Sequence, residues 1–486
     1  MNTSDNSILI LGAGPAGMAS AWELSRAGKQ VTVIEKAGQV GGLAKTYVFN
    51  EPQGTFRVDN GPHRFFSKNK YLYDMIGDLL GEKWIQVRRL TRFFVDGKFY
   101  YYPVRFRNVL SQMGIFKANK MIRDYSIEHV KGKVNLLRQG YGRQEKKKPK
   151  NFEDFVVARF GRTLAEFNMI NYTEKIWGIP AKEISVDWAD QRIAGLSIWA
   201  ALRKMLIKKG GPKTLVDTFY YPSLGSGLVY ETMSKKIQEK GSEVLLNAQP
   251  TRIVHENGSV ISVDVETKTI RPRSVISSIP ITRSVELFDP VAPEAVRQAA
   301  KKLRFRAQVY LFLTIDKEKV TYDNWVYFPD KEVPFGRITE MKNFSKEMCP
   351  KGRTSLFIEF FCFEGDEIWN AGKEKLFDMA MEWLEKLKFL RREEVLNIHM
   401  IKEPDAYPIY DLEYAANVKV ITEWLDSFEN FFAIGRPGRF RYTNQDHSLE
   451  MGILAARSVL EGKRYEVDSV GSGSEYFERG YVPTNN

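Results

Sequence analysis

The stretch between residues 7 and 35 constrains this chain more than any other part of its sequence. Residues 7–11 form a short apolar run with the length of a buried strand, and residues 12–17 follow at once as Gly-Ala-Gly-Pro-Ala-Gly. A helix-like run continues to residue 27, and residues 30–34 read as a second strand that ends at an acid. A strand, a G-x-G-x-x-G turn, a helix, a second strand and an acid within about thirty residues form the dinucleotide-binding fingerprint.

The glycines and the acid each have a physical role. Gly12 permits a tight turn, Gly14 lets the backbone approach a pyrophosphate, and Gly17 lets the helix pack closely on the strand. The free N–H groups at the helix start and its positive dipole end face the phosphates. Glu35 can accept hydrogen bonds from an adenosine ribose, and its charge disfavours the 2′-phosphate of NADP. A bare glycine motif would read as an ordinary turn, but the two strands and the acid favour a dinucleotide site.

A glycine pair selects among the dinucleotides. Residues 40–44 read Val-Gly-Gly-Leu-Ala and follow Glu35 closely. They resemble the E-x(5–6)-G-G stretch of FAD enzymes in the glutathione-reductase-like superfamily. Glycine pairs are also common in flexible loops, but this spacing favours FAD and assigns Gly42 to the cofactor. We therefore expect an α/β fold with a Rossmann-like, glutathione-reductase-like FAD-binding domain.

The composition predicts a soluble globular protein. The chain has 486 residues, 43% of them hydrophobic and 27% charged, which is enough for two or more domains. No apolar run approaches the ~18 residues of a membrane helix, and the N-terminus shows no signal-peptide pattern. Neither Cys349 nor Cys362 belongs to a C-x-x-C pair, so we expect no disulfide framework and no metal site. The expected location is the cytoplasm.

The net charge of +12 indicates an anionic partner, which could be a nucleic acid, an anionic membrane or a small anionic substrate. Nothing in the sequence resembles a nucleic-acid-binding module. The one dense basic run, at residues 146–150, reads as a solvated loop. We therefore expect a small anionic substrate and no nucleic acid.

Hydrophobic spacing suggests how the chain is divided. Apolar residues recur at helical spacing after residue 107, and strand patterns dominate after residue 301. Short apolar strands near residues 275 and 431 predict two returns to the FAD-binding domain. The expected segments are the FAD-binding domain at 1–106, 216–300 and 429–463, a helical insertion at 107–215, an antiparallel-sheet substrate domain at 301–428, and a C-terminal tail at 464–486.

Further stretches resemble one family. Residues 61–67 read Gly-Pro-His-Arg-Phe-Phe-Ser, and residues 172–178 read Tyr-Thr-Glu-Lys-Ile-Trp-Gly. Residues 327–337 carry Tyr-Phe-Pro and Pro-Phe-Gly-Arg, and residues 435–448 run from Gly-Arg to Asn-Gln-Asp-His-Ser. Together they resemble UDP-galactopyranose mutases, most closely the longer eukaryotic-type enzymes. The wider superfamily holds protoporphyrinogen oxidase and the flavin amine oxidases.

The resemblance implies a reaction and a set of residues. In this family the N5 atom of reduced FAD attacks the anomeric carbon, displaces the UDP and lets the sugar ring reclose in its other size. The implied activity interconverts the pyranose and furanose forms of a nucleoside diphosphate sugar for cell-surface polysaccharides, with NAD(P)H as a candidate reductant. A homo-oligomer is left open. The implied catalytic residues are His63, Arg192 and Arg337. The implied substrate contacts are Tyr172, Trp177, Tyr327, Tyr407 and Tyr442. The implied cofactor contacts are Gly12, Gly14, Gly17, Glu35, Gly42, His63, Gly435, Arg436, Asn444 and Asp446.

The sequence also departs from the family pattern. Gly61-Pro62 stands where the family has Gly-Gly, and Val104-Arg105 stands where the longer mutases have an aromatic residue and a glutamine near uracil. One alternative is therefore an FAD-dependent oxidase or dehydrogenase of the protoporphyrinogen or amine type. Another is a flavin-binding scaffold without activity. The basic charge and the paired arginines favour an anionic diphosphate substrate over a neutral amine.

Overall fold

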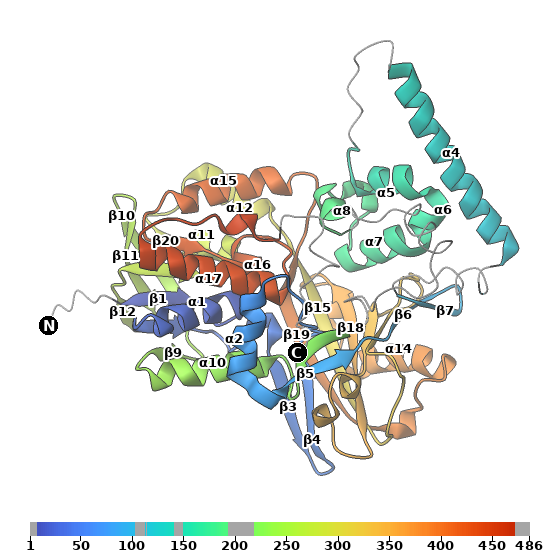
Figure 1. The fold of residues 1–486 in the computed structure, drawn as a ribbon, viewed down its shortest axis with the longest axis horizontal. Coiled ribbons are helices and arrows are strands. Elements are labelled where there is room, and N and C mark those ends of the chain that lie inside the picture. The colour runs from blue at the N-terminus through green and yellow to red at the C-terminus, as the bar shows by residue number, and fades with distance from the viewer. Residues whose placement is uncertain (1–6, 103–111, 113, 140–148, 193–217, 472–486) are drawn as a thin grey trace.

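The computed structural model describes residues 7–102, 112, 114–139, 149–192 and 218–471. Figure 1 shows a nucleotide-binding body, a body built on a large antiparallel sheet beside it, and a group of helices that ends in a long helix at the edge of the molecule. Val104, Arg105 and most of the predicted basic loop lie outside the described residues.

The nucleotide-binding body contains a parallel sheet in the order β20-β13-β1-β2-β9. Its strands are β1 (Ile8–Leu11), β2 (Val31–Ile34), β9 (Glu243–Leu245), β13 (Ser274–Ser277) and β20 (Phe431–Ala433). Residues alternate between the two faces of β1: Ile8 and Ile10 pack with the helices of one side, and Leu9 and Leu11 pack with those of the other. Both faces of the sheet are therefore buried, one by helices and the other by helices together with residues 253–265 of a smaller sheet, as the continuous apolar strands require.

Helices cover this sheet closely. Those of the nucleotide-binding body are α1 (Pro15–Arg26), α2 (Lys70–Leu80), α10 (Gly227–Glu239), α11 (Ile281–Leu287), α12 (Glu294–Lys302), α15 (Tyr414–Asp426), α16 (Gly435–Gly438) and α17 (Gln445–Glu461). A Cβ added to Gly452 of α17 would lie 2.2 Å from the carbonyl oxygen of Ala16 in α1, so this glycine lets the two helices touch. The mixed α/β fold with a Rossmann-like nucleotide-binding part is confirmed.

Smaller sheets flank this body. A sheet in the order β12-β11-β10-β14 lies on one side (Figure 1). Two antiparallel pairs lie on the other, the hairpin β3 with β4 and the sequence-distant pair β5 with β8. Their bounds are β3 (Thr46–Glu51), β4 (Gly54–Asp59), β5 (Trp84–Arg88), β8 (Thr218–Pro222), β10 (Pro250–Glu256), β11 (Ser259–Val265), β12 (Lys268–Ile270) and β14 (Phe288–Asp289).

The second body is built on a larger sheet in the order β19-β15-β18-β17-β16-β6-β7. Its pairs are antiparallel except for β16 with β6. The strands are β6 (Thr91–Val95), β7 (Lys98–Tyr101), β15 (Phe305–Ile315), β16 (Trp325–Tyr327), β17 (Arg337–Thr339), β18 (Thr354–Cys362) and β19 (Val395–Pro408). The helices α13 (Glu367–Asn370) and α14 (Lys373–Lys386) pack on one face.

This arrangement corrects two segments of the expected division. Residues 91–101, which we placed with the FAD-binding domain, pair with the larger sheet, because β6 joins β16. Helix α15, which we placed in the substrate domain, shares its buried core with β20 and α12 of the nucleotide-binding body. The alternation of aromatic residues predicts a strand at both ends of the Asp96-Gly97 turn, but it does not predict which sheet the strand joins.

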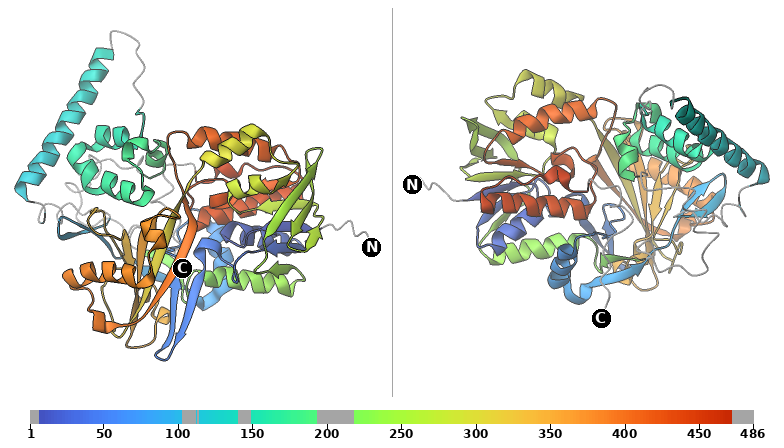
Figure 2. Two further views of the ribbon diagram at one scale, coloured as in Figure 1. Left: turned by 180° about the vertical axis from the view of Figure 1, so that it is seen from behind. Right: turned by 45° about the horizontal axis from the view of Figure 1, so that its top comes forward.

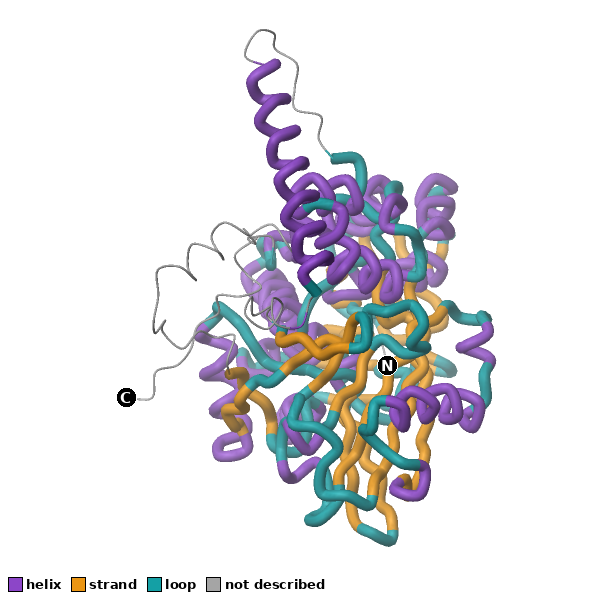
Figure 3. Tube along the Cα trace, turned by 90° about the vertical axis from the view of Figure 1, so that its right-hand side faces the viewer, coloured by secondary structure: helices purple, strands orange, loops and turns teal. Residues whose placement is uncertain are grey.

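The helical group lies where the two bodies meet, at the upper right in Figure 1. Its elements are α4 (Ile115–Gln139), α5 (Phe152–Phe160), α6 (Arg162–Ala165), α7 (Asn171–Trp177) and α8 (Asp187–Arg192). Phe152, Phe160 and Trp177 share a continuous core with the nucleotide-binding sheet. Figure 2 shows α4 at the outer edge from two further directions, and Figure 3 shows it projecting beyond the other helices.

Candidate active site

The fingerprint glycines lie where the chain has no space for a side chain. Gly12 has a φ of +95°, and a Cβ there would lie 2.5 Å from the Ser278 hydroxyl oxygen. The same hydroxyl donates hydrogen bonds to the carbonyls of Leu11 and Gly12. A Cβ on Gly17 would lie 1.9 Å from the carbonyl oxygen of Gly12. The two glycines therefore permit close contact between α1 and the ends of β1 and β13.

Two other glycines form a bare backbone surface. Gly42 has a φ of +52°, and a Cβ there would lie 2.9 Å from the Cα of Gly14. A Cβ on Gly14 itself would meet only Gly42, at 3.8 Å, because its other side opens into a cavity. The N-terminus of α1 begins directly after Gly14, with Pro15 in its first turn. Backbone N–H groups at this helix end can therefore approach phosphate oxygens.

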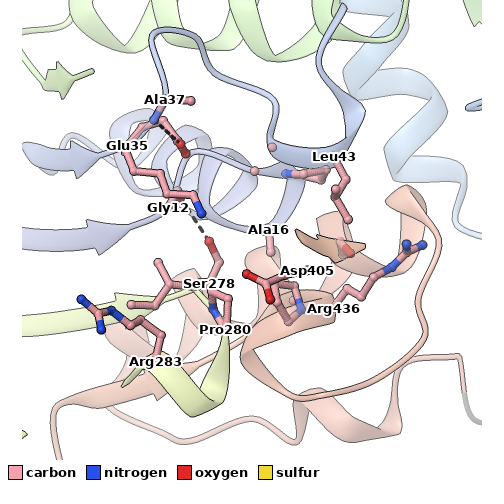
Figure 4. A pocket seen from close by; sticks show the side chains of 18 of the residues that line it. Gly12, Ala16, Glu35, Ala37, Leu43, Ser278, Pro280, Arg283, Asp405 and Arg436 are labelled. Atoms are coloured by element: carbon pink, nitrogen blue, oxygen red, sulfur yellow. Dashed lines mark hydrogen bonds between the residues drawn. The ribbon is translucent and has the colours of Figure 1, made fainter. Parts of the chain in front are cut away.

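Glu35 directly follows β2 and is 8% exposed. Its Oε2 accepts a hydrogen bond from the Ala13 amide at 2.8 Å, and its Oε1 accepts one from the Ala37 amide at 2.9 Å. Figure 4 shows the carboxylate on the wall of the cavity. Each carboxylate oxygen has a second lone pair, so both can also accept hydroxyl groups of a ribose.

The cavity lies at the carboxyl ends of four parallel strands. Gly12, Glu35, Ser278 and Gly435 follow β1, β2, β13 and β20 closely, and all four line a cavity of about 430 Å³. Ligands of open parallel sheets bind at this edge. We call it the cofactor cavity. The bare glycine surface, the helix N-terminus and the ribose-facing acid fit a flavin dinucleotide.

A second cavity of about 330 Å³, which we call the substrate cleft, adjoins the first. It lies between the larger sheet, α7 and α8. The predicted residues on its wall are His63, Tyr172, Tyr327, Arg337, Tyr407, Arg436, Tyr442, Asn444 and Asp446. The residues that line both cavities are Leu43, His63, Arg436, Asn444 and Gln445. We call this shared wall the junction.

His63 is held in a neutral form at the junction. Its Nε2 lies 3.1 Å from the carbonyl oxygen of Asn60. Burial, followed by the positive charge of Arg436, lowers the pKa of His63 to about 4. At neutral pH its imidazole therefore adds no charge to the site.

Arg436 brings a positive charge to the junction. Its Cζ lies 4.8 Å from the ring centroid of Tyr442 and 5.3 Å from that of Tyr407. Its Nε donates to the carbonyl of Thr443 at 2.9 Å, and its Nη1 donates to that of Ala406 at 3.3 Å. Within the described part of the chain, no carboxylate lies within ion-pair distance of it. The rings and carbonyls fix this charge without neutralising it.

Arg337 differs, because a carboxylate already balances its charge. Its Nη2 donates to Oε1 of Glu359 at 2.7 Å, and its Nε donates to Oε2 of the same residue. The Glu359 side chain is 1% exposed. Arg337 can still donate from Nη1 toward the cleft, so it can orient an anion, but it brings no net charge of its own.

Other predicted residues lie elsewhere. Trp177 is fully buried behind the cleft wall, and its neighbour Trp188 lines the cleft instead. Arg192 ends α8, but its side chain lies outside the described atoms. Asp446 lines the cleft and not the cofactor cavity, and burial, followed by Glu450, raises its pKa to about 8.

The sequence analysis missed several residues of the cleft. They are Arg64, Arg89, Trp188, Gln308, Tyr310 and Trp325. Arg64 stands in the loop at residues 61–67 and could have been found there, and Trp188 stands in the predicted helical insertion. The others come from strands and turns whose sequence shows only an alternating pattern.

The described residues contain neither a candidate metal-ion site nor a candidate membrane-spanning helix. Among the described residues, no group of histidine, cysteine, aspartate and glutamate could hold a metal ion. In the same part of the chain, no helix is both long and apolar enough to span a bilayer.

Comparisons with known proteins identify the family and support the fold. The family model "Flavin containing amine oxidoreductase" matches residues 15–400. An L-amino-acid oxidase of Demansia vestigiata is 22% identical over 93% of this chain and 86% of its own. A crystal structure of reduced UDP-galactopyranose mutase superposes with a TM-score of 0.80 at 22% identity, covering 96% of this chain and 99% of that one. Cyclohexylamine oxidase from Brevibacterium oxydans IH-35A gives 0.65 at 14% identity, covering 94% and 99%. The chain belongs to the flavin-containing amine oxidoreductase family.

Proposed function

We propose that this protein is an FAD-dependent mutase that interconverts the pyranose and furanose forms of a nucleoside diphosphate sugar, as UDP-galactopyranose mutases do. One observation carries the proposal. A cleft with arginines and tyrosines on its wall opens on the cofactor cavity at a junction where Arg436 has no carboxylate partner among the described residues.

The charges of the cleft favour an anionic substrate. Its wall carries Arg64, Arg89, Arg337 and Arg436. Asp446 also lines it, but with a pKa of about 8 this carboxyl group is largely protonated at neutral pH. Even with Arg337 balanced by Glu359, the wall is positive, which suits a diphosphate and disfavours a cationic amine.

Each residue of the substrate cleft would have a separate role in the reaction. Reduced FAD, when bound, supplies the N5 nucleophile for the anomeric carbon. Arg337 and Arg192 would orient the diphosphate through hydrogen bonds, and Arg436 would supply the positive charge that favours its departure. Tyr407 and Tyr442 stack at 5.5 Å and would add hydroxyl donors. The neutral His63 would bring the loop at residues 61–67 close to the cofactor without adding charge there.

The cofactor contacts would come from the dinucleotide-binding fingerprint near the N-terminus and from the segment that precedes α17. Gly14 and Gly42 would receive the pyrophosphate, and Glu35 would bind the ribose. Asn444 caps the N-terminus of α17 at the junction, where the helix dipole favours negative charge.

A second candidate is an oxidase of amino acids or amines. The family model and the Demansia vestigiata relative favour it. The crystal structure of reduced UDP-galactopyranose mutase supports the mutase, although at this identity the likeness concerns the fold. The charged cleft argues against an oxidase of amines, because such an enzyme needs a wall that accepts a cation. The substrate panel below separates the mutase from an oxidase of amino acids.

A substrate panel tests the proposal. Purified protein is incubated without oxygen with nucleoside diphosphate sugars, with and without dithionite, and the products are separated by chromatography. In parallel, oxygen uptake is followed with L-amino acids and amines. The mutase predicts an isomer of one sugar nucleotide after reduction and no oxygen uptake. Oxygen uptake with an amine and no isomer would select the oxidase.

A further inference from the structure

The outward side of α4 carries a stripe of apolar and basic residues. It consists of Phe116, Lys120, Arg123, Ile127 and Val130, which recur at helical spacing and so share one face. The exposed fractions are 93% for Phe116, 44% for Ile127 and 57% for Val130. Lys120 is exposed, and the Arg123 side chain is 73% exposed. We call these five residues the outer stripe.

The opposite side of α4 fastens the helix to the protein. Asp124 accepts a hydrogen bond from the Thr163 hydroxyl group. Met121 packs on the buried cluster that contains Phe93 and Phe167. Gly161 approaches α4 so closely that a Cβ there would lie 2.8 Å from the Tyr125 amide nitrogen. The outer stripe is therefore held outward by a packed inner face.

The acidic residues of α4 lie on its inner side, whereas basic residues lie on both sides, because Lys117 pairs with Asp96. The acids in the sequence of α4, Asp124 and Glu128, stand four residues apart and are both half-buried on the inner side. Lys120 and Arg123 lie on the outer stripe, where the only acid within ion-pair distance among the described residues is Asp124, 3.9 Å from the Arg123 Nε. The stripe thus combines large apolar side chains with positive charge and contains no acid.

We propose that the outer stripe docks the protein on an anionic lipid surface. A helix with apolar residues and lysine or arginine on one exposed side lies in the interfacial plane of a bilayer, with its charged side chains reaching the headgroups. The net charge of +12 adds to the attraction.

A second copy of the chain fits this face less well. A two-fold contact between two outer stripes would bring Lys120 and Arg123 of both copies together, with no acid on either stripe to pair with them. Phosphate headgroups of anionic lipids provide that counter-charge. The inference does not depend on the reaction that the protein catalyses.

Vesicle sedimentation tests the proposal with the flavin-loaded, full-length protein. We expect it to sediment with vesicles of phosphatidylglycerol and phosphatidylcholine, to stay in solution with phosphatidylcholine alone, and to be released by salt. Lys120→Glu with Arg123→Glu should weaken binding by at least about thirtyfold. Phe116→Ser with Ile127→Ser should weaken it as well.

A matched control carries the same change of charge elsewhere. Lys235→Glu with Lys301→Glu alters exposed residues of α10 and α12. If this control loses as much binding as the stripe variant, net charge and not α4 is responsible, and the proposal is wrong. The proposal is also wrong if the parent protein does not sediment with anionic vesicles. If light scattering shows that the parent protein is a dimer and that Phe116→Ser with Ile127→Ser makes it a monomer, the outer stripe binds a second copy of the chain instead.

Discussion

Arg337 and Glu359 form a buried, two-point ion pair in the wall of the substrate cleft. The residues stand opposite each other on the neighbouring strands β17 and β18, so the sheet itself fixes their geometry. The pair orients the guanidinium before any ligand arrives, which lowers the cost of ordering it on binding. It also means that the free positive charge at the junction comes from Arg436.

The pair predicts a strong effect on stability. Glu359→Gln should lower the free energy of unfolding by about 3 kcal/mol, because it leaves a buried guanidinium without its counter-charge. Denaturant unfolding of the flavin-loaded protein measures this. Glu423→Gln is the matched control, because Glu423 pairs with Lys419 at the surface, lines neither cavity and has a side chain that is 66% exposed. The control should change stability by less than about 0.5 kcal/mol. Equal effects would show that the buried pair has no special weight.

Substrate binding should depend on Arg337. Arg337→Ala should weaken binding of UDP by roughly thirtyfold or more, because a charge-assisted hydrogen bond to the diphosphate is lost. Calorimetric titration measures the affinity, and flavin absorbance should stay near the parent value. Arg283→Ala, at the far end of the cofactor cavity, is the control. Unchanged UDP affinity would show that Arg337 is only structural.

Flavin retention should depend on Glu35. The parent protein should be yellow with tightly held, noncovalent FAD. Glu35→Ala should lose FAD during purification, since it removes the ribose contact and the acceptor for the Ala13 and Ala37 amides. The ratio of flavin to protein absorbance measures this, with Glu239→Ala at the surface of α10 as control. A colourless parent protein that FAD cannot reconstitute would contradict the cofactor assignment.

The pH dependence of stability should report His63. Its pKa is about 4 in the folded protein, against 6.5 for an ordinary histidine, so the unfolded chain binds the proton more strongly. The neutral His63 contributes up to about 3 kcal/mol to the free energy of unfolding. This contribution is fully present above pH 6.5 and is lost as the pH falls through 4. His63→Gln should flatten the curve of unfolding free energy between these values. A curve with the same slope in both proteins would place the titration elsewhere.

The parts of the fold that depend on local sequence were predictable. The strand, glycine turn and helix at residues 8–26 follow from apolar periodicity and from backbone angles that only glycine adopts easily. Pairing between distant segments was not predictable. Residues 91–101 show a strand pattern, but the pattern does not indicate that β16 is their partner.

The site was predictable to the same extent. Motif resemblance assigned Tyr172 and Tyr407 to the substrate and His63 and Arg436 to the cofactor. In the structure the two tyrosines lie on the cleft wall, and His63 and Arg436 lie at the junction of the two cavities. It could not distinguish Trp177 from Trp188, because only packing decides which ring faces the cleft. It also gave no sign of Glu359, because the ion pair depends on the register of two neighbouring strands, which the sequence does not show. Site roles beyond this geometry stay predictions.

The redox balance of one turnover tests the mutase most directly. Protein reduced by dithionite or NAD(P)H without oxygen is mixed with the sugar nucleotide that the substrate panel selects, and flavin absorbance and product mass are followed together. The account predicts a product of unchanged mass, flavin that stays reduced over many turnovers, and a reductant that activates without being consumed in proportion. Turnover that starts from oxidised flavin in air, with hydrogen peroxide released in proportion to product, would contradict it.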